Sequence, residues 1–241
     1  SVSSSLPVDH RGGGGIFVLP PAPVISPTAG RIIADFLKAY PSARHITYDT
    51  ASCSAMLQAN ELAFGVRALP SLKIENAALI VSFGADFLGT WISPVEYTAR
   101  YAALRRLKDN QSPMLRHIQF ESGLSLTGTN ADERFPVLPS EEQALITALW
   151  QALNGQDDTL SGAVKDAIRR TAAELLEARG KSIVISGSND PAVQGLVNHI
   201  NNLLGNYGNT IDLSAPSLVR KGVDADMIGL VEEMNAGKVE A

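Results

Sequence analysis

The sequence contains a single cysteine, Cys53, among 241 residues. An internal disulfide is excluded, because a disulfide needs two thiols. An iron–sulfur cluster or a cysteine-based zinc site built by this chain alone is excluded too, since such sites need several thiolates. Cysteine content therefore carries no information on the redox compartment. Cys53 itself has two interpretations: a small buried side chain, or a thiolate before a helix that acts as nucleophile or metal ligand.

Long apolar runs and an excess of positive charge are also missing. No stretch reaches the ~18 apolar residues of a membrane-spanning helix, so we expect no direct membrane insertion. The net charge is −5, the pI is near 5.4 and no basic stripe is visible, which argues against nucleic acid as a partner. With no signal-peptide pattern and no initiating Met, we expect the chain to be a trimmed or processed piece of a larger protein.

Metal-binding spacings are lacking as well. The sequence has four histidines, and no two of them form a pattern such as H-x-x-x-H. We therefore predict no metal site from histidine. A nicotinamide enzyme would show G-x-G-x-x-G after its first strand, and PPAPVISPTAG stands there instead.

Hydrophobic periodicity predicts strands that alternate with helices. Short apolar runs predict strands at 16–19, 45–48, 77–83, 117–120, 135–138, 182–185 and 210–213. Helical spacing predicts helices at 26–40, over about twelve residues before Gly65, and at 96–108, 140–153, 160–179 and 191–204. This alternation indicates one doubly wound α/β domain over 16–213, with a mostly parallel sheet and helices on both faces.

The two ends of the chain have a different character. Residues 1–15 are rich in Ser and Gly without periodicity, and we expect a flexible tail. Four glycines lie there, but they precede a strand, whereas a phosphate-binding loop follows one. Residues 214–241 form a C-terminal extension in which VDADMIGLVEEM predicts one more amphipathic helix.

The stretch over 77–101 is the first place to look for function. Its buried strand stops abruptly at Gly84, and ligands in open α/β sheets bind outside the carboxyl ends of strands. Gly84 lets a ligand approach the backbone closely, Asp86 can accept hydrogen bonds from a base or ribose, and Trp91 can stack. The alternative is a tight turn with Asp86 as a structural cap and Trp91 buried.

A second buried strand ends in a similar way, at SGSND over 186–190. Ser186, Ser188 and Asn189 are neutral side chains at the start of a helix, which suits a phosphate or diphosphate. Asp190 opposes this, because it would repel another anion. The alternative is that Asn189 or Asp190 simply caps helix 191–204. Both strand ends lie on the same rim of the predicted sheet.

The loop over 121–135 is long and polar, and loops of that length in compact domains are often functional. Ser125, Thr127, Thr129 and Asn130 gather there. They have no nucleophile-elbow context and no adjacent base, so we do not interpret them as a catalytic centre.

Three segments resemble the molybdopterin oxidoreductase superfamily. The first is DTASCSAMLQANELAFG (49–65) followed by LKIENAALIVSFGADFLGTWISP (72–94), similar to a family unit of the form R-x-C-x-x-S-A…F-G with a strand and turn ending in G-S-N. The second is HIQFESGLSLTGTNADERFPVLPSEEQALITAL (117–149), similar to the next unit with its P-G-T-D. The third is KSIVISGSNDPAVQGLVNHINNLLGNYGNT (181–210). The resemblance covers roughly 14–213 and implies a Rossmann-like domain of that family.

The candidate cofactor-binding residues are Ser82, Gly84, Asp86, Trp91, Thr129, Asn130, Asp132, Glu142, Ser186, Gly187, Ser188 and Asn189. The resemblance implies that the cofactor at these residues would be molybdopterin guanine dinucleotide. The family's G-S-N and P-G-T-D are altered here, to GAD (84–86) and PSEE (139–142). The cluster-binding cysteines and the C-terminal barrel-like domain of the family are absent. Cys53 falls near the family's molybdenum ligand and is catalytic only if it ligates that metal.

The segment FGADFLGTWISPVEY (83–97) is similar in sequence to members of a divergent branch of this superfamily. That branch includes the large iron–sulfur subunit of the bacterial alternative complex III, a quinol-oxidising membrane complex, whose molybdopterin-like domain carries no molybdenum cofactor. The resemblance implies a cofactor-free scaffold domain of a respiratory oxidoreductase, not catalytic by itself, that contacts other domains or subunits. It implies the periplasmic side of the inner membrane, with the cytoplasm as the alternative.

Two other functions stay open at this point. The chain could bind molybdopterin guanine dinucleotide as part of an active oxidoreductase, with Cys53 on the metal. It could also be a small α/β enzyme that holds an unrelated ligand at the strand ends.

Overall fold

The computed structural model describes residues 17–18, 26–106, 114–156 and 161–239. The tail predicted over 1–15 lies outside these residues. The chain divides into two compact units, one formed by Ser1–Ser52 with Lys221–Ala241 and the other by Cys53–Arg220. This division differs from the single domain expected over 16–213, because residues up to 52 group with the C-terminal segment.

The larger unit is built on a four-stranded sheet in which all strands run parallel. Its strands in spatial order are β6 (Glu133–Pro136), β5 (Arg116–Glu121), β4 (Leu79–Phe83) and β7 (Ser182–Ser186). Every residue of β4 and β7 is buried, which is the pattern of parallel strands covered on both faces. The predicted α/β fold with a parallel sheet and flanking helices is confirmed.

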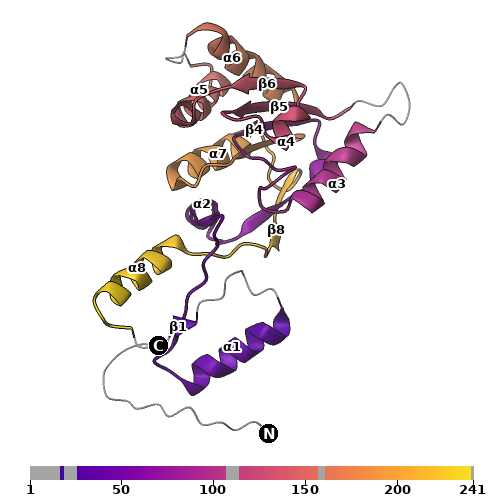
Figure 1. The fold of residues 1–241 in the computed structure, drawn as a ribbon. Coiled ribbons are helices and arrows are strands. Elements are labelled where there is room, and N and C mark those ends of the chain that lie inside the picture. Colours follow the sequence, from indigo (N-terminus) through magenta and orange to yellow (C-terminus); the bar gives the residue numbers. More distant parts are fainter. Residues whose placement is uncertain (1–16, 19–25, 107–113, 157–160, 240–241) are drawn as a thin grey trace. The chain divides into compact units, whose positions relative to one another are not determined.

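Helices cover both faces of this sheet. The elements on one face are α5 (Glu142–Leu153), α6 (Gly162–Glu177) and α7 (Pro191–Leu203), and those on the other are α3 (Pro94–Arg105) and α2 (Ser54–Phe64). Val81 packs in the first core and Ile80 in the second, because successive residues of a strand point to opposite faces. Figure 1 shows α5 and α7 to the left of the strands and α3 to the right.

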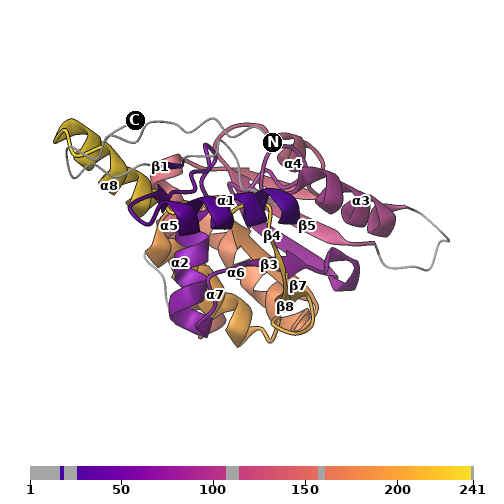
Figure 2. The same cartoon turned by 90° about the horizontal axis from the view of Figure 1, so that it is seen from below.

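Helix α2 lies beside α7 (Figures 1 and 2). A buried hydrogen bond of 2.8 Å joins them, donated by the Asn198 amide to the Asn60 side-chain oxygen. The Tyr207 hydroxyl donates to Asn198 at 3.0 Å, so this buried polar pair is satisfied within the unit.

The strand order contains one reversal. From β4 the chain moves outward to β5 and β6, and it then returns through α5 and α6 to add β7 on the other side of β4. Such a reversal is a topological switch point, where open α/β sheets usually bind ligands at the carboxyl ends of the strands. Here it lies between Phe83 and Ser186, the paired last residues of β4 and β7.

The outer edge of β7 is closed by side chains rather than by another strand. The Asn201 carboxamide accepts a hydrogen bond from the Val184 N–H at 3.1 Å and donates to the Val184 carbonyl at 2.7 Å. Thr210 and Gln194 donate to the first and last carbonyls of the strand, at 2.6 and 3.0 Å. A free strand edge would template pairing with other chains, and these side chains occupy its backbone groups.

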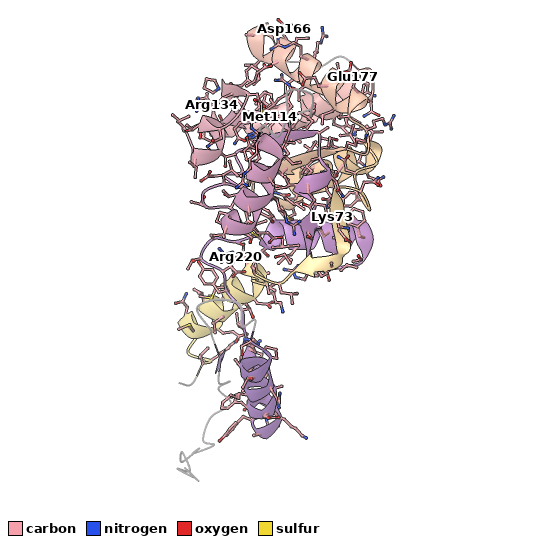
Figure 3. All side chains as sticks on the ribbon, turned by 90° about the vertical axis from the view of Figure 1, so that its right-hand side faces the viewer. Lys73, Met114, Arg134, Asp166, Glu177 and Arg220 are labelled. Atoms are coloured by element: carbon pink, nitrogen blue, oxygen red, sulfur yellow. The ribbon has the colours of Figure 1, made fainter. Side chains whose placement is uncertain are left out.

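A second sheet pairs β3 (Leu69–Leu72) with β8 (Ile211–Ser217) in antiparallel orientation. The strand predicted over 210–213 is the start of β8. Strand β3 was not predicted, because Pro70 interrupts its short apolar run. Lys73, which follows β3 and is labelled in Figure 3, pairs with Asp212 of β8 at 2.7 Å.

The smaller unit has its own elements. They are β1 (Phe17–Val18), α1 (Pro27–Ala39), β2 (Arg44–His45) and α8 (Asp224–Asn235). Helix α1 begins as predicted, with Ser26 as its cap, and α8 is the further helix predicted beyond residue 213. Strands β1 and β2 pair in parallel. None of the helices in the described part of the chain has the length and hydropathy needed to cross a membrane.

Candidate functional site

The ends of β4 and β7 meet at two glycines. Gly84 has a φ of +62°, in the left-handed region that favours glycine. Gly187 approaches it so closely that a Cβ on Gly187 would lie 2.6 Å from the Gly84 carbonyl oxygen. The Gly187 N–H donates to the Phe83 carbonyl at 2.8 Å. The two loops predicted to hold a ligand are therefore in direct backbone contact at the switch point.

Glu142, the first residue of α5, lies at the same point. Its Oε1 accepts a hydrogen bond from the Ser186 hydroxyl at 2.8 Å, and its Oε2 would lie 3.0 Å from a Cβ built on Gly84. Burial raises the pKa of the Glu142 carboxyl, and the hydrogen bond from Ser186 partly offsets this. The structure thus brings four of the predicted residues into one cluster: Gly84, Glu142, Ser186 and Gly187.

Asp86 fastens two loops together. Its Oδ1 accepts hydrogen bonds from the Thr127 hydroxyl at 2.7 Å and from the Thr127 N–H at 3.1 Å, and its Oδ2 accepts from the Thr90 hydroxyl at 3.2 Å. The Thr127 oxygen in turn accepts from the Leu88 N–H at 2.9 Å. Both Asp86 carboxylate oxygens, which would otherwise accept from a base or ribose, are therefore hydrogen-bonded within the chain. This geometry agrees with the alternative in which Asp86 is a structural cap of a tight turn.

The helix N-termini near the switch point are capped by side chains of the chain. Asp190 caps α7, accepting from the Ala192 N–H at 2.7 Å and from the Val193 N–H at 3.3 Å. Asn189 reaches the start of α2 and accepts from the Ala55 N–H at 3.1 Å. Backbone N–H groups at helix starts are the donors that a phosphate uses. Here the side-chain oxygens of Asp190 and Asn189 accept hydrogen bonds from these N–H groups, where a phosphate oxygen would otherwise bind. Ser188 donates its N–H to the Ser186 hydroxyl oxygen at 3.0 Å.

The loop over 121–135 is held from inside by Glu121. The Glu121 carboxylate accepts from the Ser125 hydroxyl at 2.6 Å and pairs with the Arg134 guanidinium at 2.5 Å (Arg134 is labelled in Figure 3). Ser125 caps α4 (Leu126–Thr129), accepting from the Gly128 N–H at 2.9 Å. The segment therefore folds into a helical turn around a buried carboxylate.

A line of polar side chains runs along β5, and the sequence analysis missed it. His117 and Gln119 approach at 3.3 Å, and the Gln119 amide donates to Glu121 at 3.3 Å. The Tyr101 hydroxyl lies 3.2 Å from His117 Nδ1. Burial lowers the pKa of His117 to about 4. The available signal was the period-two alternation of polar and apolar residues in HIQFE, which places these side chains on one face.

Three predicted cofactor residues lie away from the cluster. Asp132 precedes β6, accepts from the His117 N–H at 2.7 Å and pairs with Arg105 at 2.7 Å. Because the strands are parallel, the starts of β5 and β6 lie at the edge opposite the switch point. Thr129 and Asn130 end α4, and each donates to a carbonyl one turn earlier, at 2.8 and 2.9 Å.

Ser82, Trp91 and Cys53 belong to the second core. Ser82 is buried and donates to the Ala85 carbonyl at 3.0 Å. Trp91 and Cys53 pack against the buried cluster that includes Tyr97, whose ring centroid lies 5.9 Å from that of Trp91. The cavity that Trp91 helps to line has a volume of about 20 Å³, room for about one water molecule. A cofactor-sized pocket would need several hundred Å³.

The comparisons with known proteins assign no family. No family model matches this chain, and no curated protein matches it. Among the residues that the structure describes, no three His, Cys, Asp or Glu side chains come together in an arrangement that could hold a metal ion.

The segments that follow the strands at the switch-point edge of the sheet carry charges of one sign only. We call the segments at this edge the carboxyl-edge segments, and they are 84–95, 122–130, 137–142 and 187–190. They contain no Lys, Arg or His, and their charged residues are Asp86, Glu141, Glu142 and Asp190. A guanine dinucleotide carries a diphosphate, which is bound by cationic side chains and free backbone N–H groups. The residues at this edge do not fit that group.

Proposed function

We propose that this chain is a molybdopterin-oxidoreductase-like domain that serves as a cofactor-free scaffold in a respiratory electron-transfer complex. The resemblance of three segments and the parallel α/β sheet support the family assignment. In this proposal the carboxyl-edge segments contact other domains or subunits of a membrane-associated complex on the periplasmic side of the bacterial inner membrane.

The observation that carries the cofactor-free part is the occupation of the helix starts by Asn189 and Asp190. A diphosphate at either helix would have to displace a side-chain cap, which costs about 1 kcal/mol each. It would also approach the carboxylates of the carboxyl-edge segments, which contain no compensating cation. Displacement and repulsion act in the same direction, so the site favours its own side chains over an anionic cofactor.

The purified chain tests this proposal directly. Native mass spectrometry should give the mass of the bare polypeptide. Metal analysis and fluorescence of oxidised pterin should find neither molybdenum nor pterin in stoichiometric amount. Stoichiometric molybdenum or pterin would support the active-oxidoreductase alternative instead. A different bound small molecule would support the alternative of a small α/β enzyme.

A titration with guanosine diphosphate separates the possible reasons for weak binding. We expect no dissociation constant below about 1 mM for the wild-type chain. Asp86→Asn, which restores the Asn of the family's G-S-N, should remain equally weak, because Asn189 and Asp190 still occupy the helix starts. Tight binding by Asp86→Asn alone would show that the single charge, and not the capped helices, keeps the nucleotide out.

A further inference from the structure

The carboxyl-edge segments carry exposed apolar side chains beside their carboxylates. The exposed fractions are 84% for Val95, 70% for Leu124, 56% for Leu126 and 61% for Leu138. Val95 follows β4, Leu124 and Leu126 follow β5, and Leu138 follows β6. The carboxyl ends of neighbouring parallel strands meet at one edge of a sheet, so these four residues share that edge. We call them the apolar rim. Apolar side chains gathered in water mark interaction surfaces.

The segments that carry the apolar rim are fixed to one another. Thr127 binds Asp86 and Leu88, which joins the connection after β5 to the connection after β4. The Thr98 hydroxyl of α3 donates to the Leu88 carbonyl at 3.4 Å and ties this helix to the same loop. The Val137 N–H donates to the Glu121 carbonyl at 3.1 Å, which holds the segment after β6. A surface fixed in this way loses little conformational entropy on binding.

The charge at this edge selects the kind of partner. The four charged residues of the carboxyl-edge segments are all acidic, and the neighbouring Arg134 is already paired with Glu121. A complementary surface therefore offers apolar anchors flanked by Lys or Arg. We propose that the apolar rim binds a basic amphipathic helix of a partner protein. The inference rests on the proposed scaffold function, and it names the chemistry of the partner.

At the β7 edge of the sheet, a partner helix is favoured over an added strand. Strand addition needs free backbone donors and acceptors along an edge strand. The Asn201 side chain occupies those of Val184 on β7. The apolar rim instead offers separate side-chain anchors, which an amphipathic helix meets with residues spaced three and four apart.

Two synthetic peptides of about 18 residues, or five helical turns, test the proposal. They carry the same Leu face, and one has Lys and the other Glu on its polar face. We expect the Lys peptide to shift the methyl resonances of the four apolar-rim residues in the full chain and to bind more weakly at high salt. The Glu peptide should leave them unchanged. Equal shifts with both peptides would overturn the charge argument.

Matched variants locate the binding site. Leu124→Ser should weaken the Lys peptide about tenfold, the loss of one largely buried leucine contact. Leu62→Ser on α2 changes an equally exposed leucine, 79% accessible, outside the carboxyl-edge segments, and should leave affinity within about twofold. If both variants weaken binding equally, or if neither does, the apolar rim is not the site. That failure leaves the metal and pterin analysis intact, so the inference and the proposed function can fail separately.

Discussion

His117→Gln should make the larger unit less sensitive to acid. His117 is fully buried on β5, and burial lowers its pKa from 6.5 to about 4. Between these two values the unfolded chain takes up a proton that the folded chain does not. The free energy of unfolding therefore falls as the pH drops through this window. The loss is about 2 kcal/mol between about pH 7 and pH 4.5, and about 3 kcal/mol once the pH is below 4.

Urea unfolding followed by tryptophan fluorescence measures this effect. Both tryptophans, Trp91 and Trp150, lie in the larger unit, so the signal reports on that unit. His117→Gln should lose stability at pH 7, because Tyr101 and Gln119 lose their partner, by about 1 kcal/mol. Between pH 7 and pH 4.5 it should then lose about 2 kcal/mol less than wild type.

The control is His199→Gln, which removes an exposed histidine from α7. This variant should follow the wild-type acid response within about 0.5 kcal/mol. If His117→Gln shows the same acid loss as wild type, His117 does not resist protonation in the folded state and the argument from its burial is wrong.

Three further substitutions, the first with a matched control, test other parts of the structure by the same unfolding assay. Gly187→Ala should lower the free energy of unfolding by about 2–3 kcal/mol, because its Cβ would press on the Gly84 backbone. The control is Gly195→Ala inside α7, where the space around the glycine is open, and it should be neutral or stabilising by up to about 1 kcal/mol. Thr127→Val should lower the free energy of unfolding by about 2 kcal/mol, because the hydrogen bonds to Asp86 and from the Leu88 N–H are lost. An unchanged stability would show that these hydrogen bonds do not hold the two loops together. Asn201→Leu should lower the free energy of unfolding by about 3 kcal/mol, because the backbone groups of Val184 lose their partner. The uncovered β7 edge should also promote association of the chain, which light scattering measures. A stable monomer would contradict the proposed role of the Asn201 side chain.

The elements were predictable where their signal is local. The apolar run at 77–83 predicted β4, and Ser26 with Pro27 predicted the start of α1. The alternation of buried strands and amphipathic helices predicted the parallel α/β fold. Strand β3 was not predicted, because Pro70 interrupts its short apolar run and its partner β8 lies far along the chain.

The candidate site was predictable only in part. Gly84, Ser186 and Gly187 could be placed at one edge of the sheet, since each lies at the end of a buried strand. The contact of Glu142 with Ser186 could not be foreseen, because it depends on the return of the chain from β6 to β7. Asp132 lies away from the carboxyl-edge segments because the chain has already crossed from the end of β5 to the start of β6. A loop predicted as one polar segment starts at one edge of the sheet and ends at the other.

The sequence by itself determined the strand and helix pattern apart from β3, the carboxyl-edge position of the glycines and the acidic character of their segments. These depend on residue order alone, through hydrophobic periodicity and formal charge. Only the tertiary structure decided that Asp86 binds Thr127, that Asn189 caps α2 and that Gly187 rests on Gly84. Each of these contacts joins residues far apart in the chain. Their partners are chosen by strand order and helix packing, which a local pattern does not encode.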